Sequence, residues 1–256
     1  MLTPLTVAHI PAFTAACAYE HVFGSRILTA LRAYGLDDPK VRFFLAAEDG
    51  VPSAALHLAD SVLTVSANDK VSPAPIADLV RQHGVTEVDC SWDLCTALQT
   101  SLGGTIESSY YMEYRGPGEH GDFPDVSIGD LRTVFDVLQR SHEYYREHLV
   151  FAPWAADWEH RLSRGLSELY QIEMDGQVVG TGSIVSEDDE CGALAALAVV
   201  PEYRHKGVGS RLTRFLIQRV LEKGKTPRLI SGYDEVAELY RKLGFVTLGR
   251  WGELYL

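Results

Sequence analysis

The sequence predicts an α/β protein built from two halves with the same order of elements, and three observations support this. A segment rich in glycine and proline divides the 256 residues near the middle. A strand, turn, strand, strand pattern occurs on each side of it. In the second half only, a loop with two glycines lies between an apolar strand and an amphipathic helix. We therefore expect an α/β (α+β) fold of two tandem domains, each a mixed, mostly antiparallel sheet flanked by helices.

The dividing segment is GPGEHGDFP, residues 116–124, with three glycines and two prolines among nine residues. Such a composition is typical of a linker. It predicts a first domain over residues 1–115, a linker over 116–124 and a second domain over 125–256.

The composition narrows the classes of function. A net charge of −12 disfavours nucleic acids and anionic membranes as partners. No apolar run approaches the roughly 18 residues that span a bilayer, and the start does not resemble a signal peptide, so we expect a cytoplasmic protein. The four cysteines lack the spacing of metal or redox sites and are expected to be buried thiols: Cys17, Cys90, Cys95 and Cys191.

The two halves read as diverged copies of one pattern. Asp49-Gly50 and Asp175-Gly176 each predict a hairpin turn between apolar runs. The later segments WDLCTALQTSLGG (92–104) and YDEVAELYRKLGF (233–245) also match. The second copy is longer between these two landmarks, and the added stretch contains Arg204–Ser210.

Periodicity predicts the elements of the second half in order. The expected helices are Asp130–Tyr145, Trp154–Leu162, Val208–Glu222 and Glu235–Leu243, and the expected strands are Glu168–Met174, Gln177–Val185, Ala193–Val200 and Arg228–Ser231. We also expect Phe245–Leu248 and Glu253–Leu256 to close the chain as a hairpin.

The loop VPEYRHKGVGS, residues 200–210, carries the strongest chemical signal. Gly207 and Gly209 allow a turn and a close approach of the backbone to a ligand. The free amides and the dipole of the following helix favour an anion at this point. Arg204, His205, Lys206 and Arg211 add cationic side chains there, so the loop predicts a site for a pyrophosphate. It matches neither of the commoner phosphate-binding patterns.

Two motifs in this half resemble those of the GNAT N-acetyltransferases. The pattern V-x-P-x-x-R-x-x-G-x-G between strand and helix is similar to the acyl-CoA loop of that family, and AELYRKLGF (237–245) is similar to its second motif. The likeness covers about residues 127–256, and the first half resembles the same fold only through the repeat. It implies transfer of an acetyl group from acetyl-CoA to a primary amine of a small molecule or a peptide, without a metal.

The resemblance also implies roles for individual residues. The backbone of the strand would pair with the pantetheine arm, and the loop would bind the pyrophosphate. Asp234 falls where the family often has an asparagine, which leaves that contact in doubt. The cofactor-binding residues so implied are Leu197, Ala198, Val199, Arg204, His205, Lys206, Gly207, Val208, Gly209, Ser210 and Asp234. Tyr240 falls on the usual general acid.

The general base is not evident from the sequence. Family members often have a glutamate or histidine on the strand before the loop, but here Cys191–Val200 contains no ionisable side chain except Cys191. His142 and Glu143, near the end of the first helix, are favoured over Glu190, and a chain of water molecules is a further alternative. The acidic run 187–190 is interpreted as a solvated hairpin tip in preference to a metal site.

The acceptor cannot be identified from the sequence. Aromatic residues of the second half are candidates to line its pocket or to form core: Tyr144, Tyr145, Phe151, Trp154 and Trp158. The first half has Gln99 in place of Tyr240 and no glycine loop, so it is expected to bind no CoA and to cover the sheet edge or shape the acceptor site. A catalytically silent acyl-CoA-binding protein and a GNAT-like scaffold without cofactor remain alternatives. A monomer and a homodimer are both compatible with the sequence.

Overall fold

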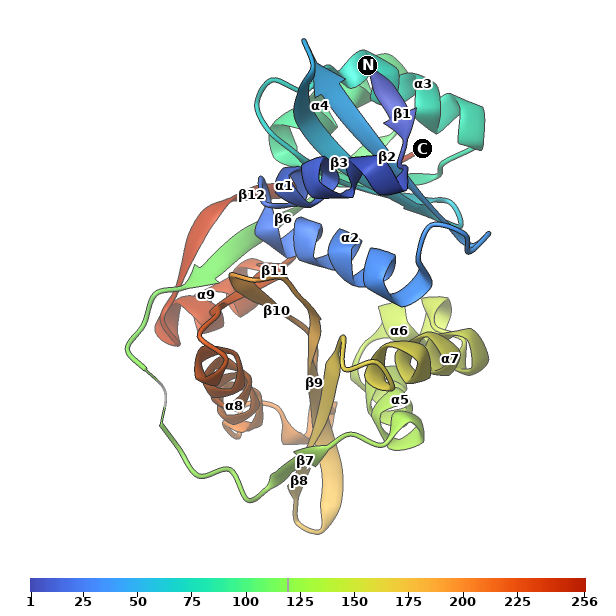
Figure 1. Cartoon of the computed structure of the whole chain (residues 1–256). Helices are drawn as coiled ribbons and strands as arrows, with labels where there is room; N and C mark the ends of the chain where they lie inside the picture. The colour runs from blue at the N-terminus through green and yellow to red at the C-terminus, as the bar shows by residue number, and fades with distance from the viewer. Residues whose placement is uncertain (119) are drawn as a thin grey trace. The chain divides into compact units, whose positions relative to one another are not determined.

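The computed structural model describes residues 1–118 and 120–256, and these form two compact units (Figure 1). Unit 1 comprises Met1–Met112, Ile230–Ala237 and Thr247–Leu256, and unit 2 comprises Glu113–Leu229 and Glu238–Val246. Glu119, in the expected linker 116–124, lies outside the described residues. The units therefore contain segments that are distant in the sequence, and each is described by itself.

Unit 1 contains the first ten elements of the chain. They are β1 (Leu2–Pro4), the 3-10 helix η1 (Val7–His9), α1 (Ile10–Cys17), α2 (His21–Tyr34), β2 (Val41–Glu48), β3 (Val51–Ala59), β4 (Val62–Ala67), α3 (Pro73–His83), β5 (Glu87–Ser91) and α4 (Trp92–Leu102). Four further elements have residues in both units: β6 (Thr105–Tyr114), β11 (Thr226–Ser231), α9 (Asp234–Lys242) and β12 (Phe245–Tyr255).

The sheet of unit 1 has the order β1-β2-β3-β4-β5-β12-β6. Successive side chains of a strand point to opposite faces, and β2 shows this directly. Phe43 and Leu45 pack against α1 and α2, whereas Phe44 and Ala46 belong to the core under α3 and α4. Two helical layers thus cover the two faces of the unit 1 sheet.

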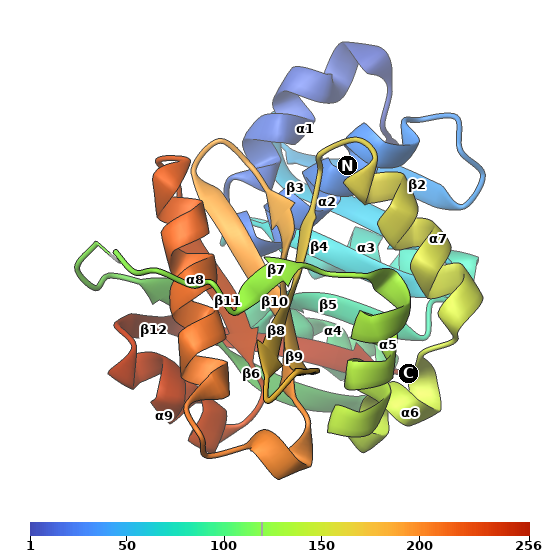
Figure 2. The ribbon, with the colours of Figure 1, turned by 90° about the horizontal axis from the view of Figure 1, so that it is seen from below.

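Unit 2 contains the remaining nine elements. They are β7 (Val126–Ile128), α5 (Leu131–Ser141), α6 (Glu143–His148), α7 (Phe151–Leu162), β8 (Glu168–Met174), β9 (Gln177–Glu187), β10 (Cys191–Val199), the 3-10 helix η2 (Pro201–Tyr203) and α8 (Val208–Glu222). The order is β11-β10-β9-β8-β7, with β10 and β11 parallel and the other pairs antiparallel. Helix α8 covers one face of β9 and β10, and α5 covers the other (Figures 1 and 2).

Several predicted elements are confirmed with their bounds. Helix α8 begins at Val208 and ends at Glu222, and Val208, Leu212, Leu216 and Val220 are buried on one face. The two Asp-Gly hairpin turns have positive φ at both central residues, 51° and 80° for Asp49 and Gly50 and 55° and 74° for Asp175 and Gly176. A two-residue turn with this backbone matches the twist of the strands that it joins.

Two predicted elements are wrong. The expected helix Asp130–Tyr145 is broken at His142, whose backbone is extended and whose ring caps the separate helix α6. The expected C-terminal hairpin is instead the single strand β12, which pairs with β5 from Trp251 to Tyr255. Gly252 marks a close approach and not a turn, because a Cβ there would lie 2.6 Å from the Cys95 Sγ atom.

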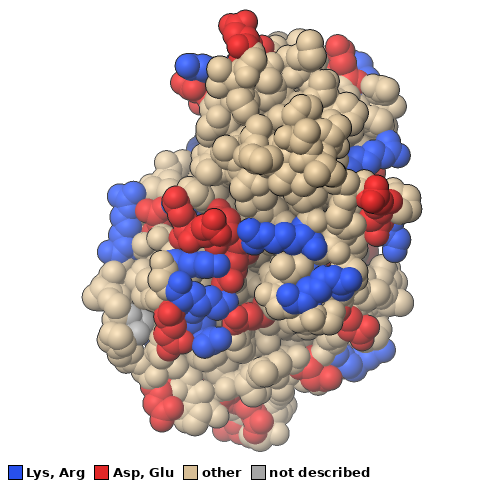
Figure 3. All heavy atoms as spheres, in the orientation of Figure 1, with Lys and Arg blue, Asp and Glu red and all other residues tan. Residues whose placement is uncertain are grey.

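The cysteines and the charged surface residues lie as the composition predicted. All four cysteines are buried thiols. On the face shown in Figure 3, acidic and basic side chains are interspersed and do not gather into one basic surface. No helix within residues 1–118 and 120–256 has the length and apolarity to cross a bilayer.

Candidate active site

The glycine loop of unit 2 connects the end of β10 to the start of α8 through an unusual backbone path. His205 has φ = 60° and Gly207 has φ = 83°, both in the left-handed region. An added Cβ at Gly207 would have no neighbour within 4 Å, so glycine is favoured there by the backbone angle and not by lack of space. The two left-handed residues turn the chain so that α8 can begin at Val208.

The start of α8 presents backbone donors. Its first backbone hydrogen bond runs from the Arg211 N–H to the Gly207 carbonyl. The amides of Val208, Gly209 and Ser210 therefore precede the helical ladder, and Gly207 at the N-cap has no side chain to accept from them. A Cβ at Gly209 would lie 3.7 Å from Val199, so this glycine leaves space beside the end of β10. Three amides and the positive end of a 15-residue helix make an anion site.

Two of the four predicted cations at this end hold the loop to the rest of unit 2. Arg204 donates to the backbone carbonyls of Val199, at 3.2 Å, and Ser141. Arg211 forms an ion pair with Asp125, and its hydrogen bond holds the pKa of that carboxyl below its usual value. These contacts fix the loop against α5 and the segment before β7.

The other two cations point outward. His205 and Lys206 are exposed, and the Lys206 ammonium lies 4.5 Å from the centre of the Tyr203 ring. Tyr203 in turn accepts a hydrogen bond from Gln177 at 2.5 Å. Lys206 is thus the cation of the loop that is both exposed and positioned by a neighbouring side chain.

A β-bulge interrupts β10 just before the predicted pantetheine-binding residues. The register with β9 shifts between Ala195 and Ala198, and Ala196 has φ = 51°. Ala196 and Leu197 thus lie opposite a single residue of β9 and are displaced from the regular ladder. The Ser183 hydroxyl donates to the Ala195 carbonyl at 2.8 Å and supports the bulge. The bulge thus includes Leu197, and Ala198 and Val199 follow it and lead into the loop.

Tyr240, the predicted acid, lies on α9 with only 7 % of its surface exposed. Burial raises its pKa well above the usual value, and Tyr145 adds to this effect. Its ring packs edge-on against Phe245, with ring centres 5.6 Å apart. A phenol with a raised pKa keeps its proton at neutral pH, as a proton donor must.

The two predicted base residues lie at the surface. His142 and Glu143 are exposed at the start of α6. The His142 Nδ1 atom accepts a hydrogen bond from the Tyr144 amide at 3.1 Å. In a neutral ring the proton is then on Nε2, because Nδ1 acts as the acceptor. The nitrogen that could accept a proton from a substrate is therefore already used to cap α6.

The alternative acidic residues form a turn. The Asp188 carboxylate accepts hydrogen bonds from the amides of Glu190, at 2.8 Å, and Cys191, at 2.6 Å. Within the described residues, no group of three or more histidine, cysteine or acidic side chains has the arrangement of a metal site.

Asp234 belongs to unit 1, whereas the loop belongs to unit 2. It is the first residue of α9 and accepts a hydrogen bond from the Tyr110 hydroxyl at 2.5 Å. A small hollow of about 380 Å³ adjoins it, and Arg250 also lines this hollow. The structure therefore gives Asp234 a partner inside unit 1.

The aromatic candidates divide into packed and exposed residues. Phe151 and Trp154 both pack against Phe135, and Trp158 is buried beside Trp154. Tyr144 is 55 % exposed. Most of this group therefore forms the core among α5, α6 and α7.

Two residues at this site were not predicted. Asp125 follows the glycine-rich segment, and a lone acidic residue there carries no pattern that pairs it with Arg211. Ala196 adopts a left-handed backbone, and alanine gives no sequence signal for that conformation.

The loop and Tyr240 also lie in the part of the chain that is similar to a known family. The model of the acetyltransferase (GNAT) family matches residues 131–245, from α5 to the start of β12, and so includes both the loop and Tyr240. Residues 131–245 belong to the GNAT family. The fold and the loop geometry of unit 2 are consistent with this GNAT domain.

Two curated relatives are amino-acid acetyltransferases. The protein of Pseudomonas putida strain GB-1 is 30 % identical over an alignment of 257 positions, which covers 90 % of this chain and 58 % of the relative. The protein of Neisseria meningitidis serogroup A is 26 % identical over 152 residues, which is 58 % of this chain and 30 % of the relative. The chain thus spans between about a third and three fifths of these relatives.

Solved structures extend the likeness to the whole chain. A tandem GNAT protein from the clavulanic acid biosynthesis pathway has a TM-score of 0.65 at 16 % identity, covering 99 % of this chain and 97 % of that one. A GNAT-family acetyltransferase from Colwellia psychrerythraea has a TM-score of 0.62 at 14 % identity, covering 100 % and 99 %. The predicted fold class, two tandem GNAT-like domains, is confirmed.

Unit 1 has a strand, loop and helix in the corresponding place, with different chemistry. Pro73 and Pro75 occupy the first and third positions of α3 and have no N–H to donate. At the end of β4, the Glu20 carboxylate accepts a hydrogen bond from the Ala67 amide at 3.1 Å. Burial raises the pKa of Glu20 to about 7. Gln99, the counterpart of Tyr240, donates to the Gly104 carbonyl at 3.1 Å.

Proposed function

We propose that this protein transfers an acetyl group from acetyl-CoA to a primary amine, with an amino acid, another small amine or a peptide amine as acceptor. The observation that carries the proposal is the uncapped start of α8 beside the bulged end of β10. The names of the curated relatives favour the amino acid among these acceptors.

The binding of acetyl-CoA rests on two backbone features of unit 2. The amides of Val208, Gly209 and Ser210, with those of His205 to Gly207, would donate to the pyrophosphate, and Lys206 would approach it from solvent. The backbone of Leu197, Ala198 and Val199 would pair with the pantetheine arm. Arg204 positions the loop through its bonds to protein carbonyls. Asp234 stays a weaker candidate, because Tyr110 already occupies its carboxylate.

The reaction requires two proton movements. A neutral amine attacks the thioester carbonyl, the C–S bond breaks, and the amine gives up a proton while the leaving thiolate gains one. Tyr240 is the proposed donor to the thiolate. Glu143 is the proposed acceptor from the amine, either directly or through water, and His142 could take this role only after its Nδ1 atom releases the Tyr144 amide. An acid or base of this kind contributes about 10² to 10⁴ in rate.

The same proposal assigns a role to each remaining part of the chain. Residues 1–115 would be a degenerate GNAT-like copy without cofactor, joined by residues 116–124 to the acetyltransferase domain of residues 125–256. We expect the protein to act in the cytoplasm, as a monomer or a homodimer, without a metal.

The test measures thiol release from acetyl-CoA with a panel of amino acids, polyamines and short peptides. Wild type should release thiol with at least one acceptor, and Tyr240→Phe should lower kcat by at least about 100-fold with little change in acetyl-CoA binding. The catalytically silent alternative predicts binding in calorimetry without turnover by wild type. Equal turnover by wild type and Tyr240→Phe would remove Tyr240 from the mechanism.

A further inference from the structure

Unit 1 contains a hollow of about 660 Å³ between its edge strands and α3. The apolar part of its wall comes from β1, β2 and α3 and includes Leu2, Phe44 and Leu79. The polar part is Arg42, Asp78, Gln82 and His83. A concave site with an apolar wall and a few convergent polar groups is the usual form of a small-molecule site.

The polar groups at this hollow are mainly hydrogen-bond donors. The Arg42 guanidinium donates to the His83 Nδ1 atom at 2.9 Å, which uses the lone pair of that ring and leaves the proton on Nε2. Asp78 is paired with Arg81 at 3.0 Å. No carboxylate within the described residues pairs with Arg42. The hollow therefore has one carboxylate in its wall, Asp78, which is already paired with Arg81, and the Arg42 guanidinium lies there without a carboxylate partner among the described residues.

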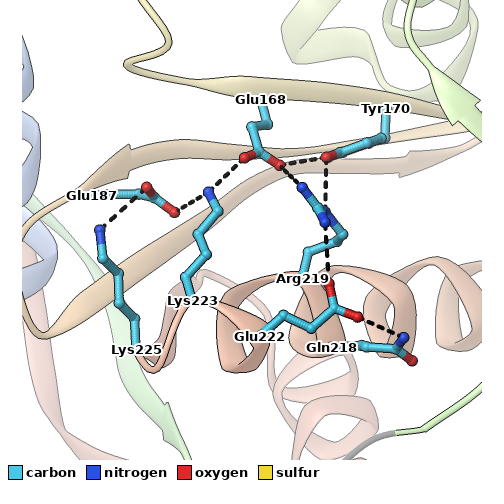
Figure 4. A network of polar contacts seen from close by, with 8 residues as sticks. All are labelled: Glu168, Tyr170, Glu187, Gln218, Arg219, Glu222, Lys223 and Lys225. Carbon is cyan, nitrogen blue, oxygen red and sulfur yellow. Dashed lines mark hydrogen bonds and ion pairs between the residues drawn. The ribbon is translucent and has the colours of Figure 1, made fainter.

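The corresponding place in unit 2 contains that anion (Figure 4). Glu168 lies seven residues before the Asp of its hairpin turn, as Arg42 does in unit 1, and Tyr170 corresponds in the same way to Phe44. The Glu168 carboxylate accepts from the Tyr170 hydroxyl and forms ion pairs with Lys223, at 2.5 Å, and Arg219, at 3.5 Å. Unit 2 thus fills this place with a carboxylate from its own chain.

The helices correspond as well. Leu79, Gln82 and His83 of α3 have the spacing of Phe215, Gln218 and Arg219 of α8. In unit 2, the Tyr170 ring packs on Phe215 with ring centres 4.7 Å apart, and Arg219 donates to the Tyr170 hydroxyl at 3.2 Å. In unit 1, the Phe44 and His83 rings are 5.8 Å apart. Basic groups occur in both helices, whereas the matching strand position is the acidic Glu168 in unit 2 and the basic Arg42 in unit 1.

We propose that the hollow in unit 1 binds a small organic carboxylate with an apolar body, and that its carboxylate takes the place of Glu168. Arg42 and the His83 Nε2–H donate to the carboxylate, and Leu2, Phe44 and Leu79 contact the body. One guanidinium beside a neutral imidazole suits a single negative charge better than a double one in a chain of net charge −12. The site consists of unit 1 residues alone and does not depend on the proposed acetyl transfer.

The test titrates the full-length protein with phenylacetate, monitored by calorimetry and by amide shifts in NMR spectra. We expect saturable binding, with shifts at α3 and β2. The double variant Arg42→Glu/His83→Arg rebuilds the carboxylate and the cation of unit 2 and should weaken binding at least tenfold. Arg42→Gln, which adds no charge, should also weaken it and checks that the first result does not come from misfolding.

The matched control is Arg164→Glu. Arg164 also donates to a histidine, His160, at 3.1 Å, but at the exposed end of α7. This variant should bind phenylacetate as wild type does. Absence of binding to wild type, wild-type affinity in both Arg42 variants, or binding of the cation phenethylamine as tight as that of phenylacetate would overturn the proposal.

Discussion

The segment from β4 to α3 in unit 1 and the segment from β10 to α8 in unit 2 follow the same path with opposite chemistry. In unit 2 the strand bulges at Ala196, and the helix begins with three available amides. In unit 1 the helix begins with Pro73 and Pro75, and the end of the strand is bonded to the Glu20 carboxyl. The start of α8 thus leaves backbone donors for the anion that we propose, whereas the end of β4 is already bonded to a carboxyl group of the chain.

The two helices keep a buried face although their first turns differ. Ile76, Leu79 and Val80 of α3 are buried against the sheet, as are Leu212 and Leu216 of α8. Burial of such a face supplies most of the stability of a helix. Pro73 and Pro75 are not among the buried residues of α3, so prolines can stand in its first turn without a change in this core.

The largest expected effect concerns the backbone donors at the start of α8. Gly207→Glu places a carboxylate at the start of α8, where like charges cost several kcal/mol, so acetyl-CoA binding should weaken roughly 100-fold or more. Calorimetry with CoA measures this directly.

Gly224→Glu is its matched control. Gly224 follows the other end of α8, has φ = 71° and has no atom within 4 Å of an added Cβ, so the strain is the same and only the position differs. If both variants lost binding equally, backbone strain and not anion repulsion would be the cause.

The second largest effect concerns the Glu20 carboxyl group at the end of β4. Burial holds the pKa of Glu20 at about 7 in the folded protein, against 4.5 for the ordinary group. The neutral carboxyl stabilises the fold fully below pH 4.5, and this contribution is lost as the pH rises through 7. Glu20→Gln has no such loss. The free energy of unfolding of wild type relative to this variant should therefore fall by roughly 2–3 kcal/mol between pH 5 and pH 8.

Urea denaturation of both proteins at the two pH values measures this difference. Burial also raises the pKa of Asp89, but this group is present in both proteins and cancels in the comparison. If the difference in free energy of unfolding between wild type and Glu20→Gln were the same at pH 5 and pH 8, Glu20 would be ionised at both pH values.

A smaller effect is expected when unit 2 is given a feature of unit 1. Ser210→Pro places proline at the third position of α8, as Pro75 stands in α3, and removes one N–H without breaking a bond of the helical ladder. The loss of one charge-assisted hydrogen bond should weaken CoA binding about tenfold. Circular dichroism should show an unchanged helix content, and unchanged affinity would exclude the Ser210 amide from the site.

The smallest effect is the reverse change in unit 1. Pro75→Ala restores an N–H to α3, but Glu20 still occupies the end of β4. We expect no second CoA site, so the stoichiometry in calorimetry should stay at about one per chain. A second binding event in this variant would mean that the prolines alone had closed the site in unit 1.

The sequence predicted the parts of the fold that depend on local patterns. The stripe of apolar residues set both ends of α8, and the Asp-Gly pairs located both hairpin turns, because periodicity and turn chemistry are properties of short segments. The loop around Gly207 was also found in this way. The break at His142 was missed, because a histidine cap resembles any polar residue in a helical pattern.

The remaining features depend on contacts between distant segments. Glu20 meets the Ala67 amide across 47 positions of the chain, and Arg211 meets Asp125 across 86. Neither pair has a spacing rule that sequence reasoning could apply. The continuous strand β12 was mistaken for a hairpin for the same reason, since Gly252 is explained by Cys95 of α4 and not by its neighbours in the chain.

The position of β12 has a consequence for biosynthesis. Residues 251–255 of β12 belong to unit 1 and pair with β5, although they are translated more than 150 residues after it. While the ribosome still holds these residues in its exit tunnel, β5 has an open edge where unpaired backbone groups attract other chains. The N-terminal unit therefore completes its sheet only after synthesis has passed Tyr255, and a nascent chain stalled shortly before that point would be prone to aggregate.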